Sequence, residues 1–165
     1  MTTFKVKNTF ANRGKKSEDA MAKYLSEWSG PTREANRLTD SKAAGRIIKA
    51  AAADFEYFCA VPQKDDWSKP IEDLTMHGLI EVKETEHEYR LGRDKVPQLA
   101  RLRKRAKCGG VCLVAIHHST LKVWRVVDSD YLANTGDKGS WNLTLVPTYA
   151  DLATAMAEVY PGVFQ

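Results

Sequence analysis

The chain contains 165 residues, of which 43% are hydrophobic and 28% are charged, and its formal net charge is +4. This balance is typical of a globular domain with a substantial core, and no apolar run approaches the length of a membrane span. The first residues lack the apolar core of a signal peptide, so we expect a cytoplasmic protein with no membrane partner. The three cysteines are an odd number without the spacing of a disulfide framework, and we expect free thiols.

The positive charge is concentrated in two clusters. Residues 1–17 carry five Lys or Arg residues and no acid, and residues 101–107 carry five more. Such clusters suit a polyanion, most simply nucleic acid, and a solvated basic face is the alternative explanation. The candidate DNA-binding residues are Arg13, Lys15, Lys16, Arg37, Lys42, Arg101, Arg103, Lys104 and Arg105.

The first predicted element is a helix that follows a basic segment. Residues 1–16 show little periodicity and predict a flexible basic arm. Ser17 suits the N-cap of a helix, and Glu18 is a favourable acid in its first turn. Apolar residues at helical spacing continue to Trp28, where a Ser-Gly-Pro sequence ends the helix.

The next part of the chain leads into a predicted strand. Residues 31–45 are polar and irregular, and the Ala-rich residues 47–53 are compatible with a helix or with extended chain. An apolar run from Asp54 to Val61 predicts a strand. Residues 62–78 are polar and rich in turn formers, so we expect a loop inserted there.

Residues 79–85 predict the strand on which the functional hypothesis depends. Side chains alternate along a strand, so Glu81 and Lys83 point to the same side. A carboxylate can hold a hard divalent cation, and an ammonium group can orient a water or stabilise negative charge. Asp54 on an adjacent strand can supply a second carboxylate. A solvated ion pair is the alternative explanation of this pattern.

The remaining elements are a basic helix, two strands and a short helix. Asp94 can cap the basic helix, which tolerates Pro97 in its first turn and ends at a Cys-Gly-Gly sequence. Residues 111–117 predict a buried strand and residues 121–127 a second strand. Residues 128–144 predict a loop-rich region, and residues 151–159 predict a final helix.

This order of elements and motifs resembles a known family. The residues on which the resemblance rests are Asp54, the sequence Glu-Val-Lys-Glu-Thr at residues 81–85, Gln98 on a basic helix, and a Gly-Gly pair before a hydrophobic strand. Together they resemble the RecU-type Holliday junction resolvases, including phage-encoded forms, of the PD-(D/E)xK nuclease superfamily. The resemblance implies an α/β fold with a restriction-endonuclease-like core, in which helices flank a central mixed β-sheet. Residues 17–165 would then form a single nuclease domain with an inserted loop at residues 62–78.

The resemblance also implies roles for individual residues. Asp54 and Glu81 would bind Mg²⁺ or Mn²⁺ together with the backbone carbonyl of Val82, and Lys83 would handle the attacking water. Glu18 and Gln98 would complete the catalytic set. Only the family pattern assigns a role to Glu18 and Gln98. The implied protein is a homodimeric, metal-dependent endonuclease that resolves four-way DNA junctions, acting in a bacterial cytoplasm as a phage protein.

Several alternatives remain open at this point. The spacing from Asp54 to Glu81 is longer than is usual in the family, so four other acids can replace Asp54 as the ligand: Asp65, Asp66, Glu72 and Asp73. The protein can instead be a catalytically silent junction-binding or architectural protein, or a nuclease of the superfamily with another DNA substrate. A zinc site is disfavoured because its thiols and imidazoles lack paired CxxC spacing; these residues are Cys108, Cys112, His117 and His118.

Overall fold

A computed structural model describes the fold over residues 11–38, 51, 53–63, 66–134 and 139–165. For residues 11–13, 62–63, 66–73 and 134 the backbone is described without the side chains. In chain order the elements are α1 (Ala11–Trp28), β1 (Arg33–Arg37), β2 (Phe55–Gln63), β3 (Asp66–Thr85), β4 (Arg90–Gly92), the 3₁₀ helix η2 (Arg93–Lys95), α2 (Leu99–Lys107), β5 (Val111–His118), β6 (Val123–Asp128), α3 (Ser129–Asn134), β7 (Ser140–Asn142) and α4 (Leu152–Val159).

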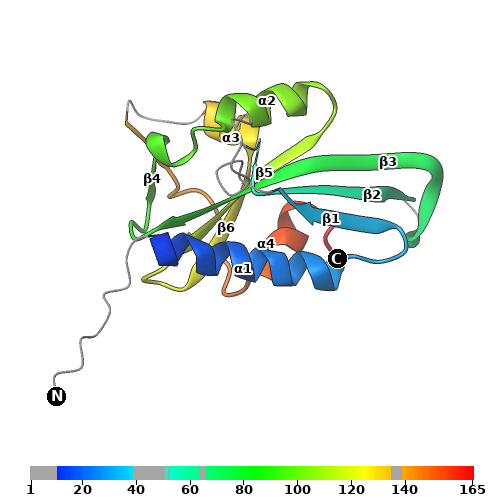
Figure 1. Cartoon of the computed structure of the whole chain (residues 1–165), viewed down its shortest axis with the longest axis horizontal. Coiled ribbons are helices and arrows are strands. Elements are labelled where there is room, and N and C mark those ends of the chain that lie inside the picture. Colours follow the sequence, from blue (N-terminus) through cyan, green and yellow to red (C-terminus); the bar gives the residue numbers. More distant parts are fainter. Residues whose placement is uncertain (1–10, 39–50, 52, 64–65, 135–138) are drawn as a thin grey trace, which may run out of the picture.

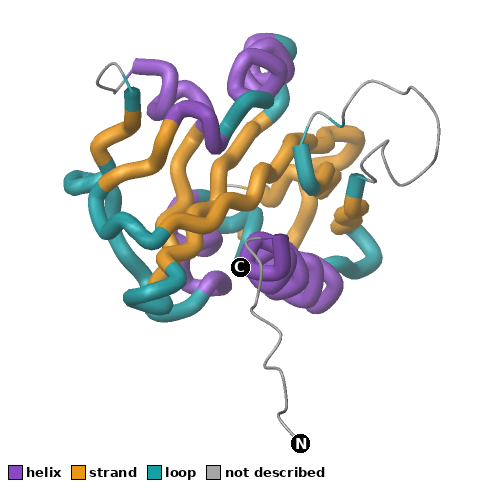
Figure 2. Tube along the Cα trace, turned by 60° about the vertical axis from the view of Figure 1, so that its left-hand side comes forward, coloured by secondary structure: helices purple, strands orange, loops and turns teal. Residues whose placement is uncertain are grey.

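A central five-stranded sheet organises these elements, in the order β1-β2-β3-β5-β6. β3 and β5 are parallel, and the other neighbouring pairs are antiparallel. Helices α1 and α4 cover one face of the sheet, and α2 and α3 cover the other (Figures 1 and 2). Strands β4 and β7 form a separate two-stranded sheet. The expected fold class, a central mixed sheet flanked by helices, is confirmed.

The alternation of side chains along β3 divides the core into two layers. Val82 packs in the same cluster as Met21 of α1. Leu79 packs on the opposite face, in the cluster that contains Leu102 of α2. Since side chains of a strand alternate between faces, Glu81 belongs to the α2 side of the sheet.

Helix α1 begins earlier than the sequence predicts. It starts at Ala11, so the backbone of residues 11–16 is helical and does not belong to a flexible arm; residues 1–10 lie outside the described residues. Ser17 is not the N-cap. Ser17 lies within α1, and its side chain is buried. Its hydroxyl donates a hydrogen bond to Glu84 of β3 at 2.7 Å and so connects the helix to the sheet.

The segment at residues 62–78 is not the irregular loop that its composition predicts. β2 and β3 form a long hairpin that projects beyond the rest of the sheet (Figure 1). The pairing runs through Ala60 and Thr75 and continues with Pro62 opposite Pro70. The register is irregular next to Pro62, which fits the confinement of proline to bulges and strand edges.

The polar region at residues 31–45 also contains a strand that the sequence did not reveal. β1 pairs with β2, and Arg37 is opposite Phe55. Residues 39–50 lie outside the described residues, as does most of the Ala-rich segment at residues 47–53, so its two interpretations stay open.

The basic helix starts later than predicted. Asp94 belongs to η2, and α2 begins at Leu99 with Gln98 in the N-cap position. Pro97 explains the break, because the residue before a proline is disfavoured in the helical region. Val96 accordingly has φ −121° and ψ 64°.

The last part of the chain has more regular structure than expected. The region predicted to be loop-rich contains α3 and β7. The final helix forms as predicted, and Asp151 caps it by accepting a hydrogen bond from the Thr154 N–H at 2.8 Å. No helix in the described residues is long and apolar enough to cross a membrane. The three cysteines are free thiols.

Candidate metal-binding and catalytic site

Glu81 and Lys83 lie on the same side of β3, as the alternation of side chains predicts. Glu81 is fully buried, with 0% of its surface exposed. The Lys83 Nζ forms an ion pair with Glu81 Oε1. Lys83 itself is only partly buried, with 19% of its side chain exposed. The pair therefore connects a buried carboxylate to an ammonium group that solvent can reach.

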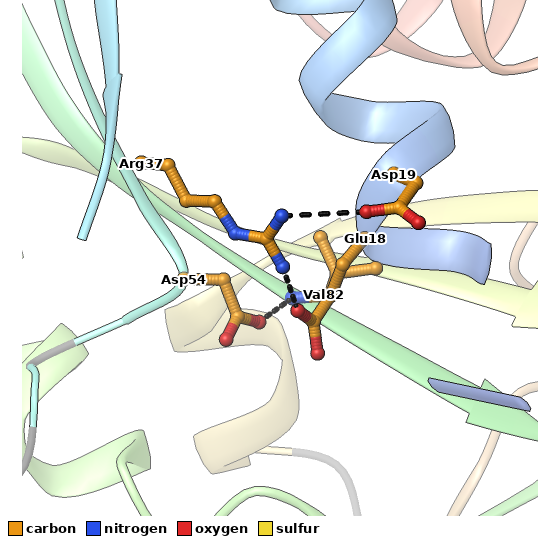
Figure 3. A network of polar contacts seen from close by, with 5 residues as sticks. All are labelled: Glu18, Asp19, Arg37, Asp54 and Val82. Atoms are coloured by element: carbon orange, nitrogen blue, oxygen red, sulfur yellow. Dashed lines mark hydrogen bonds and ion pairs between the residues drawn. The ribbon is translucent and has the colours of Figure 1, made fainter. Parts of the chain in front are cut away.

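Asp54 is brought to this pair by the register of β2 and β3. Phe55 lies opposite Ile80 in the antiparallel ladder, so the residue before Phe55 lies beside Glu81 and Val82. The Val82 N–H donates a hydrogen bond to Asp54 Oδ2 at 2.7 Å. This bond, visible in Figure 3, fixes the carboxylate at the edge of β3.

The alternative acids lie much farther from Glu81. Asp66 and Asp73 belong to the outer part of β3, and Asp65 lies outside the described residues. Even Asp73 is eight residues from Glu81 on one strand, which is roughly 25 Å at the usual rise of a strand. The backbone therefore favours Asp54 as the second carboxylate.

The surroundings disfavour the charged forms of both acids. Burial, and after it the negative charge of Asp54, raise the pKa of Glu81 to about 7 against the opposing charge of Lys83. Burial also raises the pKa of Asp54, against the hydrogen bond from Val82 and the charge of Lys83. The buried carboxylate of Glu81 and the partly buried carboxylate of Asp54 repel each other when both are charged, and a bound cation would relieve that repulsion.

The donor set suits a hard divalent cation. Apart from the ion pair with Lys83, the described residues offer the Glu81 oxygens no hydrogen-bond donor. The N–H and C=O of one strand residue point to the same side, so the Val82 carbonyl lies on the side of Asp54. These groups are oxygens, as Mg²⁺ and Mn²⁺ prefer. Within the described part of the chain, no three His, Cys, Asp or Glu side chains converge as a complete ligand set, so water would have to supply further ligands.

Glu18 reaches the site from α1. Its carboxylate forms an ion pair with Arg37 of β1, and Arg37 also contacts Asp19 at 3.3 Å (Figure 3). The negative charge of Glu18 contributes to the raised pKa of both Asp54 and Glu81. Glu18 therefore belongs to the electrostatic environment of the site.

Gln98 occupies a different position from the expected one. It precedes α2 instead of lying on a face of the helix. Its side-chain oxygen is buried and has no hydrogen-bond partner among the described residues. No hydrogen bond among the described residues joins Gln98 to the acids, so its place in the catalytic set stays a prediction.

A cavity of about 640 Å³ opens beside the C-terminal end of β3 and gives access to Lys83. Glu18 and Val82 line it, together with His87 and Lys95. Both side chains are exposed, and the sequence assigns neither of them a role in the site. His87 lies in irregular chain after β3 and Lys95 in the short 3₁₀ helix η2, and in neither place does a periodicity predict which side chains turn toward the site.

The basic candidates lie on opposite faces of the sheet. On α2, Arg101, Lys104 and Arg105 are exposed, whereas the Arg103 Nε lies 3.6 Å from Asp130. On α1, Lys15 and Lys16 are exposed, and the side chain of Arg13 is not described. Lys42 lies outside the described residues. Arg37, predicted to bind DNA, is instead engaged with acids beside Asp54.

The residues considered for zinc have other partners. Cys112 is buried in the core, and His118 contacts the buried Arg125. Burial and the charge of Arg125 lower the pKa of His118 to about 4. His117 stacks on Trp124 with ring centroids 4.8 Å apart.

Comparison with models of protein families finds no match, and comparison with curated protein sequences finds none either. Comparison with solved structures finds the Holliday junction resolvase Hjc of Archaeoglobus fulgidus, an archaeal hyperthermophile. The TM-score is 0.49 and the sequence identity is 18%, and the alignment covers 83% of this chain and 97% of that chain. The geometry of Asp54, Glu81 and Lys83 is independent of this similarity.

Proposed function

We propose that this protein is a metal-dependent endodeoxyribonuclease. The observation that carries the proposal is the buried carboxylate of Glu81, which pairs with Lys83 and lies beside Asp54 on the neighbouring strand. A buried carboxylate with no donor other than Lys83 among the described residues is costly unless a cation joins it. A structural ion pair between Glu81 and Lys83 alone would not require a second, partly buried acid beside it.

Each residue would contribute to phosphodiester hydrolysis in its own way. Asp54, Glu81 and the Val82 carbonyl would hold Mg²⁺ or Mn²⁺. When bound, such an ion polarises the phosphate and lowers the pKa of a bound water. Lys83, at the border between the buried pair and the open cavity, would position the attacking water or stabilise negative charge on the phosphate.

Four-way DNA junctions are the proposed substrate. The sequence resemblance to RecU-type resolvases supports this choice, as does the exposed basic surface of α2 on the same side of the sheet as Glu81. A junction presents two strands that are cut symmetrically, so we propose a homodimer with two active sites. By the same resemblance, we propose that it acts in a bacterial cytoplasm as a phage protein.

Incubation with a labelled four-way junction and with a linear duplex of matched sequence tests the proposal. We expect cleavage of the junction in Mg²⁺ or Mn²⁺, no cleavage in EDTA, and much slower cleavage of the duplex. A protein that binds the junction and leaves it uncut throughout metal titrations is an architectural protein. Equal cleavage of both DNAs indicates a nuclease with another substrate.

A further inference from the structure

Arg37 occupies an unusual place for a residue of an edge strand. Its backbone is fixed opposite Phe55, and the next residue, Leu38, donates its N–H to the Asp54 carbonyl at 2.8 Å. The end of β1 is therefore attached to the residue that carries the second carboxylate. Figure 3 shows the guanidinium of Arg37 between the acids of α1 and Asp54.

The guanidinium contacts two successive acids of α1. One terminal nitrogen is paired with Glu18 and the other lies 3.3 Å from Asp19. Its carbon also lies 5.9 Å from the ring centre of Phe55, within the range of a cation–π contact. A single exposed ion pair contributes little, but these contacts together fix the position of the charge.

Carboxylates outnumber cations at this end of the sheet. Among the described residues, Glu18, Asp19, Asp54 and Glu81 share the positive charges of Arg37 and Lys83. Lys83 is committed to Glu81. Arg37 is therefore the group that balances the acids of α1 next to Asp54.

We propose that Arg37 is a built-in counter-ion, which keeps the carboxylates together in the metal-free protein and weakens the binding of the divalent cation that later joins them. This inference rests on the proposed metal site and adds a regulator of its affinity. Arg37 acts through Glu18 and Asp54 and is a positioning residue. Its charge also repels a divalent cation held by Asp54.

Binding of Mn²⁺ to metal-free protein without DNA tests the inference, by calorimetry or by the resonance signal of free Mn²⁺. Arg37→Gln should bind Mn²⁺ about fivefold more tightly or better, because a positive charge near the ion is removed. Arg37→Lys keeps the charge and should stay close to the parent. Arg33→Gln is the matched control, since Arg33 lies on the same strand but bonds to the Gln165 carbonyl at 2.6 Å.

Thermal unfolding supplies a second readout. Because the stabilisation by a bound ligand grows with the logarithm of its affinity, Mn²⁺ should raise the Tm of Arg37→Gln more than that of the parent. If Arg37→Gln folds only when Mn²⁺ is present, the inference also stands, since the ion has replaced the guanidinium. If it fails to fold with and without Mn²⁺, Arg37 is structural and the inference falls.

The remaining outcomes separate this inference from the proposed function. A parent that binds Mn²⁺ while Arg37→Gln binds it equally or less tightly overturns the counter-ion role and leaves the metal site intact. Equal tightening in Arg33→Gln would show a general effect of net charge and would also overturn it. A parent that binds no Mn²⁺ removes the metal site and, with it, any role for Arg37 there.

Discussion

The carboxyl group of Glu81 is fully buried, and its surroundings disfavour its ionised form. Burial and the nearby charge of Asp54 raise its pKa to about 7, well above the usual value of a glutamate. In the unfolded chain the group ionises near its ordinary pKa. Between the two values the native state binds the proton more strongly, so the free energy of unfolding falls as pH rises.

The stability of the metal-free protein should therefore depend on pH through this residue. In EDTA, the parent should lose free energy of unfolding as pH rises from about 5 to 8, and Glu81→Gln should lose less. Denaturant unfolding at several pH values measures both slopes. A parent and a variant with identical slopes would show that Glu81 has an ordinary pKa.

At the level of single residues, the pairing of Glu81 with Lys83 could be predicted from the sequence, whereas the partners of Arg37 could not. The period of a strand places Glu81 and Lys83 on one face without any knowledge of the rest of the fold. The position of Arg37 depends on the pairing of β1 with β2. Its partner Glu18, 19 residues earlier, is brought to it by the packing of α1. A basic residue in a polar segment gives no sign of such partners.

At the level of elements, two misassigned segments have physical explanations. β1 is short and most of its side chains are exposed, so its stability comes from backbone pairing with β2, which composition does not reveal. The outer part of β3 is polar and contains Pro70, both of which usually indicate loops. In contrast, the apolar run at Val111–His118 forms the buried strand that its composition predicts.

The hairpin can be shortened without changing the site. Gly78 must be kept, because a side chain there would clash with the Val111 carbonyl oxygen. Replacement of residues 61–74 by an Asn-Gly turn would join Ala60 to Thr75, which already face each other.

We expect the shortened protein to fold and to bind Mn²⁺ with the affinity of the parent, because Asp54 and Glu81 lie beyond the cut. Circular dichroism and calorimetry check the two statements. A folded protein that has lost Mn²⁺ binding would assign the ligand to the acids of the hairpin, in place of Asp54.

At the level of the whole molecule, the sheet lies between α2 and α1, which carries the described part of the first basic cluster. α2 lies on the same side as Glu81, whereas α1 covers the opposite face. We therefore expect the exposed cations of α2 to hold DNA at the proposed site, although Gly14 and Glu18 of α1 also line the cavity at Lys83. Sequence alone identified both clusters but could not place them, since their separation depends on the crossover between β3 and β5.

Substitution of Arg101, Lys104 and Arg105 by Gln should weaken binding to junctions of every sequence. The slope of log K against log salt should fall in magnitude by about 2 to 3, because each lost phosphate contact removes about 0.9. Filter binding in EDTA over a salt series measures this slope. Lys23→Gln on the opposite face is the control, and an unchanged slope in the triple variant would exclude α2 from the interface.

The central claim is that Asp54 and Glu81 serve one metal-dependent cleavage site. The most direct measurement is single-turnover cleavage of a four-way junction in Mg²⁺ by the parent, Glu81→Gln, Asp54→Asn and the double variant. Each single variant should bind the junction as the parent does and cut it at least about 10²-fold more slowly, and the double variant should be little slower still. Glu84→Gln, on the same strand but bonded to Ser17 on the other face, should cut normally. Cleavage by Glu81→Gln at the rate of the parent would contradict this account.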